Sequence, residues 1–292
     1  MLAALLLSGC PQKDADSGAT GSSSTKKLKV LCTTSIIADC ARRLGGEYCD
    51  VNSLMGPGVD PHLYKAKESD LTALADAALV LYTGLHLEAK LADVLEQLGE
   101  RRACIAVGDA IPPELLLDAQ GTGGNYDPHV WFDVMLWQHC VKSIYEAIAK
   151  ADPAHNADYT ANYDQLRTEM GALDAQLRHD AIAIPEPQRV IITSHDAFRY
   201  MGRAYGFEVR GLQGISTQSE AGTGDVQELI SFVVQRKIPA LFVESSVPRR
   251  SIEAVQEGCQ AKGWQVSIGG ELLSLSWHTG SGARRWSKAR WP

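Results

Sequence analysis

The chain has 292 residues, of which 45% are hydrophobic and 22% are charged, as in an ordinary soluble globular protein long enough for two compact domains. Its 28 basic and 35 acidic residues give a net charge of −7 without a concentrated basic patch. This balance argues against nucleic acid as a partner, because phosphate binding needs clustered Lys and Arg. No apolar run reaches about 18 residues, so the sequence predicts no membrane-spanning segment.

The N-terminus is similar to the signal segment of a bacterial lipoprotein. Residues 1–9 (MLAALLLSG) are almost wholly apolar, and LSGC at residues 7–10 resembles the lipobox, where the exported chain is cleaved and Cys10 is acylated. The positively charged leading region of a signal peptide is missing, which leaves a start farther upstream or a chance apolar N-terminus as alternatives. Residues 11–27 are rich in Gly, Ser, Thr and charge and predict a flexible tether. We therefore expect an exported, membrane-anchored lipoprotein, periplasmic or at the cell surface.

The remaining cysteines show neither a CxxC pair nor metal-ligand spacing. We expect them to be small buried hydrophobic residues, with a disulfide between Cys40 and Cys49 as the alternative in an exported protein. They are Cys32, Cys40, Cys49, Cys104, Cys140 and Cys259.

From residue 28 onward, short β-branched runs alternate with helical patterns, which predicts an α/β protein with parallel sheets covered by helices. In the first half we expect strands at residues 29–33, 51–55, 78–82 and 104–107. Helices are expected there at residues 70–77, 88–98 and 130–149. The second half repeats the scheme, with strands at residues 189–193, 208–212, 240–244 and 265–268 and helices at residues 197–204, 226–235 and 251–262.

Residues 153–184, between the halves, predict one long helix that begins near Pro153 and ends before Pro185. Its apolar residues recur every three or four positions, at Tyr159, Tyr163, Leu166, Met170, Leu173 and Leu177. About 30 residues at about 1.5 Å each span about 45 Å, enough to join two lobes as a rigid spine. The alternative is one helix within a continuous domain. The predicted organisation is a signal and tether (1–27), a first lobe (28–152), the helix (153–184) and a second lobe (185–292).

Three of the eight histidines share a sequence context that predicts a metal site. His62 follows a strand in GPGVDPHLY (56–64), His129 precedes a helix in DPHVW (127–131), and His195 lies between a strand and a helix. Open α/β sheets bind ligands at the carboxyl ends of their strands. Imidazole suits zinc, copper, iron and nickel, and a set that also contains carboxylates admits manganese.

Other residues near these motifs have less specific signals. Asp60 and Asp127 either orient the imidazoles from behind or only shape the Asp-Pro turns. His86, in GLHLE, is a weaker candidate ligand. The histidines on predicted helices are expected to be solvated: His139, His155 and His179.

Several motifs together resemble a known family. GPGVDPHLY, GLHLE, DPHVWFD, ITSHDAF, RAYGFEV, GLQGIST, FVESSVP and IGGEL are similar to those of the cluster A-I solute-binding proteins of zinc and manganese ABC importers, in particular the TroA-type proteins of treponemes. The resemblance covers residues 28–273. It implies two lobes joined by a rigid helix, with His62, His129 and His195 as three of four ligands to the transported ion.

The same resemblance implies the partners. It predicts a monomer that delivers Zn²⁺ or Mn²⁺ to the membrane permease of an ABC importer. The histidine-rich acidic loop typical of dedicated zinc proteins in the family is absent, since residues 115–126 contain no histidine. Both metals therefore remain candidates.

The C-terminal tail departs from the family pattern. Family members continue from GGEL into a Ser-Asp step whose aspartate is the fourth ligand, but Leu275 occupies that position here and cannot coordinate a metal. The atypical tail (275–292) also lacks the apolar periodicity of the amphipathic helix that usually ends such proteins. We hypothesise a shifted reading frame, testable by rereading the coding DNA for Ser-Asp and a helical pattern. Glu244, Glu271 and His278 are the substitutes considered for the fourth ligand.

Two other functions compete with metal capture. Three histidines and an open position also describe a catalytic zinc site, yet no HExxH motif is present and no carboxylate is clearly placed as a general base. A surface adhesin that binds a host macromolecule is the second alternative. For metal capture we expect affinity to fall as the pH drops through about 6.5, because histidine ligands must be neutral.

Overall fold

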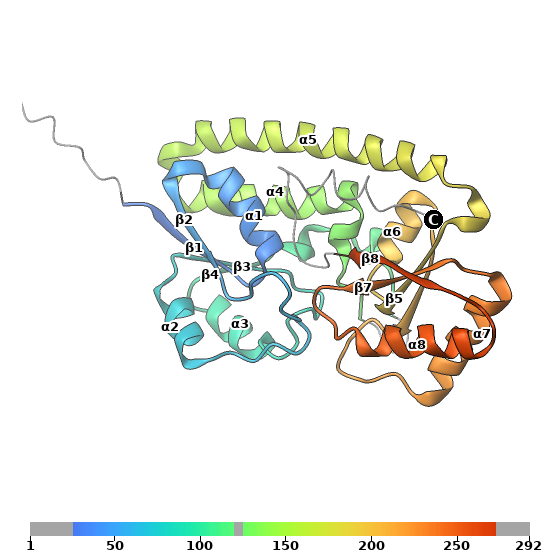
Figure 1. Ribbon diagram of the computed structural model, residues 1–292. Coiled ribbons are helices and arrows are strands. Elements are labelled where there is room, and N and C mark those ends of the chain that lie inside the picture. The colour runs from blue at the N-terminus through green and yellow to red at the C-terminus, as the bar shows by residue number, and fades with distance from the viewer. Residues whose placement is uncertain (1–25, 120–124, 273–292) are drawn as a thin grey trace, which may run out of the picture.

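The computed structural model describes residues 26–119 and 125–272, which form two α/β lobes spanned by one long helix (Figure 1). The first lobe contains a parallel sheet with the strand order β2-β1-β3-β4. Its strands are β1 (Leu28–Cys32), β2 (Cys49–Ser53), β3 (Leu79–Tyr82) and β4 (Ala103–Ala106). Its helices are α1 (Ser35–Gly45), α2 (Glu68–Asp76), α3 (Ala92–Gly99) and α4 (Val134–Ala151).

The second lobe contains two pairs of parallel strands, β5-β6 and β7-β8, which lie against each other along β5 and β7. The strands are β5 (Val190–His195), β6 (Glu208–Gln213), β7 (Ala240–Glu244) and β8 (Ser267–Leu272). The helices are α6 (Arg199–Tyr205), α7 (Thr223–Arg236) and α8 (Arg250–Ala261). Because β5 and β7 run side by side, their last residues, His195 and Glu244, are neighbours.

The central strands are buried on both faces, as expected of parallel sheets covered by helices. Along β7, Phe242 belongs to the hydrophobic cluster shared with α1, α4 and α5, whereas Leu241 and Val243 face α7 and α8. Along β1, Val30 belongs to the shared cluster and Leu31 packs against α2 and α3. This alternation follows from the two-residue period of a strand. It explains why these segments are almost continuously apolar.

The long helix is α5 (Asn156–Ala183), and it runs over both lobes in Figure 1. A 3₁₀ turn, Pro153–His155, precedes it, so the helix begins three residues later than predicted. The predicted apolar stripe packs into the shared cluster: Tyr159, Tyr163, Leu166, Met170, Leu173 and Leu177. Near its second-lobe end the buried Asp174 accepts a hydrogen bond from the Tyr205 hydroxyl at 3.2 Å. The α/β class and the joining helix are confirmed, while the predicted domain boundaries stay predictions.

Two of the predicted helices that begin later than expected have an acidic side chain bound to backbone N–H groups near the start. The helix predicted at residues 88–98 begins at Ala92, since Glu88 is buried and accepts hydrogen bonds from Thr33, Thr83 and Gly84. The helix predicted at residues 130–149 begins at Val134, where Asp133 caps it. The strand predicted at residues 265–268 is displaced in the same direction, to Ser267–Leu272.

The six cysteines in the described ranges are all free, and Cys104 alone among them is only half-buried. Cys40 and Cys49 are therefore not joined, and the alternative of a disulfide between them is wrong. The Cys49 Sγ atom instead lies 4.0 Å from the Tyr159 hydroxyl. Burial raises the pKa of the Cys40 thiol to about 12, so this cysteine behaves as a small hydrophobic residue.

Segments outside the described ranges include the lipobox with Cys10, most of the tether and the tail with Leu275 and His278. Within residues 26–119 and 125–272, no helix combines the length and the apolar character needed to cross a membrane.

Candidate metal site

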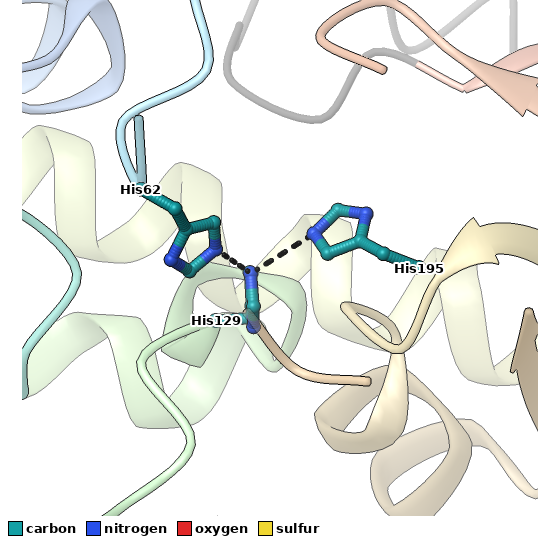
Figure 2. A group of neighbouring side chains, drawn as sticks. All are labelled: His62, His129 and His195. Carbon is teal, nitrogen blue, oxygen red and sulfur yellow. Dashed lines mark hydrogen bonds between the residues drawn. The ribbon is translucent and has the colours of Figure 1, made fainter. Parts of the chain in front are cut away.

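Three buried histidines meet where the two lobes face each other, as Figure 2 shows. His62 lies in the loop between β2 and α2, and His129 lies immediately before the turn that leads into α4. His195 is the last residue of β5 in the second lobe. Their exposed fractions are only 2–3%, although each lies in or next to a loop. The structure thus brings together the three histidines that the sequence singled out.

The ring nitrogens have the spacing of ligands around one small cation. The Nε2 atom of His129 lies 3.2 Å from Nε2 of His62 and 3.3 Å from Nε2 of His195. Tetrahedral zinc with Zn–N bonds of about 2.0–2.1 Å would place two ligand nitrogens about 3.3–3.4 Å apart. The three rings therefore surround a position that an ion of this size fits.

Two buried carboxylates fix which nitrogen faces that position. Asp127 Oδ1 accepts hydrogen bonds from the backbone N–H of His129, at 3.0 Å, and from its Nδ1 atom, at 2.8 Å. Glu244 Oε1 accepts from the backbone N–H of His195 at 2.9 Å, and its Oε2 atom lies 2.6 Å from His195 Nδ1. Each of these carboxylate contacts favours the tautomer that has its proton on Nδ1 and its lone pair on Nε2.

These tautomers explain why the donor set suits a metal. With both Nδ1 atoms protonated, the Nε2 lone pairs of His129 and His195 face each other across 3.3 Å. Two acceptors this close repel each other unless a cation or a shared proton lies between them. A dication at the common position would turn this repulsion into coordination.

The surroundings also keep two of the rings neutral. Burial, reinforced by the neighbouring imidazoles, lowers the pKa of His62 to about 3. Burial likewise holds the pKa of His129 well below its usual value. Burial acts in the same direction on His195, but the hydrogen bond and charge of Glu244 outweigh it and raise its pKa. His62 and His129 are therefore ready to bind a metal at neutral pH, and His195 is the ring that a proton competes for.

The two aspartates of the Asp-Pro-His motifs have different roles. Asp127 both shapes its turn and orients the His129 ring, so the two alternatives hold together. Asp60 Oδ1 accepts the backbone N–H of His62 at 2.9 Å and shapes the turn, while Oδ2 accepts a hydrogen bond from Thr217 in the second lobe.

The other histidines in the described ranges lie elsewhere. His86 is exposed and does not join the cluster, so its candidacy as a ligand is not supported. His179 is exposed on α5, as expected, and His139 is half-buried on α4. His155 lies in the 3₁₀ turn before α5 and is only partly exposed, because its Nδ1 atom contacts Asp152 at 2.7 Å and its ring stacks on Tyr48.

Among the described residues, only these three histidines form a group of three or more side chains whose spacing could hold a metal ion. Glu244, considered as a substitute fourth ligand, lies instead behind His195, and Glu271 is exposed on β8. The orienting role of Glu244 was missed in the sequence, although its place at the end of an apolar strand was a usable signal. Arg199, whose Nη1 lies 3.5 Å from Asp127 Oδ2, was also missed.

Comparison with known proteins agrees with this geometry. Residues 30–283 match the family described as zinc-uptake complex component A, periplasmic. The chain belongs to this family. Its members are solute-binding proteins that capture metals for ABC import, which confirms the resemblance found in the motifs.

Individual members of the zinc-uptake component A family are similar over nearly the whole chain. The manganese-binding lipoprotein MntA of Bacillus subtilis is 47% identical over 274 residues, covering 94% of this chain and 88% of the relative. The zinc-binding protein TroA of Treponema pallidum is 44% identical over 257 residues, covering 88% and 83%. The solved structure of periplasmic TroA superposes with a TM-score of 0.85 over 88% of this chain and 93% of that one.

Proposed function

We propose that this protein captures a Zn²⁺ or Mn²⁺ ion with His62, His129 and His195 and delivers it to the membrane permease of an ABC importer. The observation that carries the proposal is the convergence of three buried Nε2 atoms from two lobes, two of them oriented by buried carboxylates. The names of the similar relatives, a manganese-binding lipoprotein and a zinc-binding protein, support the same ligand class.

The donor set bears on the choice of metal. Three neutral imidazoles favour zinc, and divalent zinc generally binds nitrogen sites more tightly than manganese. The separations of 3.2 and 3.3 Å also suit a tetrahedral ion. We therefore expect zinc to bind more tightly in solution, whichever ion is transported in the cell.

The proposal includes a location outside the cytoplasm. An acylated Cys10 followed by the tether at residues 11–27 would hold the protein at the membrane while it exchanges metal with the permease. Relatives named as lipoproteins support this anchor. We further propose that the protein acts as a monomer, which size-exclusion chromatography with light scattering tests.

Calorimetric titration of the purified protein with zinc and with manganese tests the metal site. We expect one ion per chain, with binding lost in His129→Ala and retained in His179→Ala, a control whose side chain is 81% exposed on α5. Retained one-to-one binding in His129→Ala would contradict the assignment. Absence of binding by the folded wild-type protein would overturn the proposed function.

A catalytic zinc site is the competing function that the structure allows to be tested specifically. A hydrolase needs a general base beside the metal-bound water. The two carboxylates that contact the histidine rings, Asp127 and Glu244, are both held at Nδ1 atoms, on the side away from the Nε2 cluster. We therefore expect zinc-loaded protein to hydrolyse an activated ester no faster than His129→Ala does. An adhesin role stays a prediction, for which metal-dependent binding to host macromolecules is the test.

A further inference from the structure

The loop that carries His62 is attached to the opposite lobe. Thr217, in the second-lobe loop after β6, donates a hydrogen bond from Oγ1 to Asp60 Oδ2 at 2.6 Å, although the two residues lie 157 positions apart. The other oxygen of the same carboxylate accepts the backbone N–H of His62 at 2.9 Å. One carboxylate therefore connects a candidate metal ligand of the first lobe with the backbone framework of the second.

A second contact shows that the attachment is close along this loop. Gly58, two residues before Asp60, has a positive φ of 81°. A Cβ atom at this position would lie 3.3 Å from the backbone oxygen of Ser245, which follows β7 in the second lobe. The loop thus passes tightly beside the second lobe at two points.

Burial and charge favour a strong Asp60–Thr217 contact. Thr217 is only 9% exposed and Asp60 is half-buried, so water competes poorly for this hydrogen bond. A hydrogen bond to an ionised carboxylate is also stronger than one between neutral groups. The negative charge of Asp60 acts on both His62 and His195, which places it near candidate ligands of both lobes.

From these contacts we infer that the Asp60–Thr217 hydrogen bond holds the two lobes together at the site and slows release of the bound ion. The inference rests on the proposed function. An ion held by His62, His129 and His195 leaves when His62 swings away or when the lobes part. Either movement displaces the loop at residues 56–62 from the second lobe and breaks the Asp60–Thr217 hydrogen bond. Both residues act by positioning His62, not by touching the ion.

The test measures the rate at which zinc leaves the loaded, full-length protein when it is mixed with an excess of a coloured chelator. Thr217→Val removes the hydroxyl with little change in shape, and we expect release about tenfold faster, the effect of losing one charged hydrogen bond. Thr217→Ser restores the hydroxyl and should release zinc within about twofold of the wild-type rate. The matched control is Thr168→Val, because the Thr168 hydroxyl bonds only within α5, to the Asp164 carbonyl at 2.8 Å.

A double-variant cycle distinguishes the effect of losing the Asp60–Thr217 hydrogen bond from the effect of a general loss of stability. In an Asp60→Ala background, Thr217→Val should cause no further acceleration, because the bond is already absent. Thr217→Ala serves in its place should the valine variant not fold. The inference would be overturned if a folded Thr217 variant released zinc at the wild-type rate. It would also be overturned if the Thr217 substitution accelerated release equally with and without Asp60. Wild-type protein that binds no zinc would instead overturn the proposed function, a result visible before any release rate is measured.

Discussion

The Nδ1 atoms of the candidate ligands differ in their partners. His129 has Asp127 and His195 has Glu244, whereas the Nδ1 atom of His62 has no carboxylate partner among the described residues and this ring is positioned through its backbone. Carboxylates behind metal-binding histidines fix the tautomer and increase ligand basicity. We therefore expect the strength of metal binding to depend on side chains that do not themselves contact the ion.

We expect Glu244→Gln to weaken zinc binding by about 10- to 100-fold. The glutamine amide can donate a hydrogen bond to His195 Nδ1, which would move the ring proton to Nε2 and block the metal-binding lone pair. Competition titration against a chelator measures the change. Glu253→Gln, at an exposed position on α8, is the control and should bind as wild type does. Unchanged affinity in folded Glu244→Gln would contradict the orienting role.

Acidification should weaken metal binding through one histidine. Glu244 raises the pKa of His195 despite burial, whereas burial lowers the pKa of His62 to about 3 and also lowers that of His129. Because only the neutral ring binds metal, the affinity for zinc reaches its full value above the raised pKa of His195. Below that pKa it falls about tenfold per pH unit. Affinities measured between about pH 8 and 5 should show that zinc binding displaces one proton from His195. Constant affinity over this range would count against histidine ligation.

Among the elements, α4 connects the site to the shared hydrophobic cluster. It begins five residues after His129, and its buried face includes Trp137, Cys140 and Ile144. Asp133 caps its N-terminus by accepting the backbone N–H groups of Met135 and Leu136 at 3.1 and 3.0 Å. The cap stops the helix short of the Asp-Pro-His motif, so His129 stays in an irregular segment that can point its ring between the lobes.

Removing this cap should destabilise the protein. Asp133→Ala leaves the two backbone N–H groups without their side-chain acceptor, and we expect the free energy of unfolding to fall by about 1 kcal/mol. Urea denaturation of the metal-free protein measures it. Asp164→Ala, at an exposed position within α5, should change the free energy by less than about 0.5 kcal/mol. Equal losses in the two variants would show that the cap contributes nothing specific.

The helical stripe shows what an element-scale pattern predicts well. Residues from Tyr159 to Leu177 were expected to face a core from their spacing alone, and all six do. The starts of helices were predicted less well. Glu88 and Asp133 accept hydrogen bonds from backbone N–H groups, and the helices that follow them begin later than the pattern indicated. A carboxylate within a helical pattern can be exposed on the helix or can bind backbone N–H groups before the helix begins. The spacing of apolar residues does not distinguish these two cases.

For the whole molecule, the candidate ligands come from two lobes that pack on one helix. His62 and His129 belong to the first lobe and His195 to the second, while α5 packs along both. An ion bound by all three would join the lobes and stabilise only the folded chain.

Metal should therefore raise the unfolding temperature. At about 100 times its dissociation constant, a ligand that binds only the folded state adds about 2.7 kcal/mol to the free energy of unfolding. Scanning calorimetry with zinc should show a rise of several degrees that a chelator reverses. His129→Ala should show no such rise, while His179→Ala should behave as wild type does. A rise of the same size in His129→Ala would place the stabilising ion elsewhere.

The α/β class, the joining helix and the three histidines could be predicted from the sequence, because each follows from a local pattern. Apolar periodicity depends on the geometry of a single helix or strand, and Asp-Pro-His motifs are contiguous in the chain. Two contacts could be seen only in the fold: Glu244 lies behind His195, 49 residues away, and Thr217 binds Asp60. The first contact depends on β7 lying beside β5, and the second depends on how one lobe faces the other. Neither arrangement leaves a periodic trace in the sequence, since one hydrogen bond between distant residues constrains only two positions.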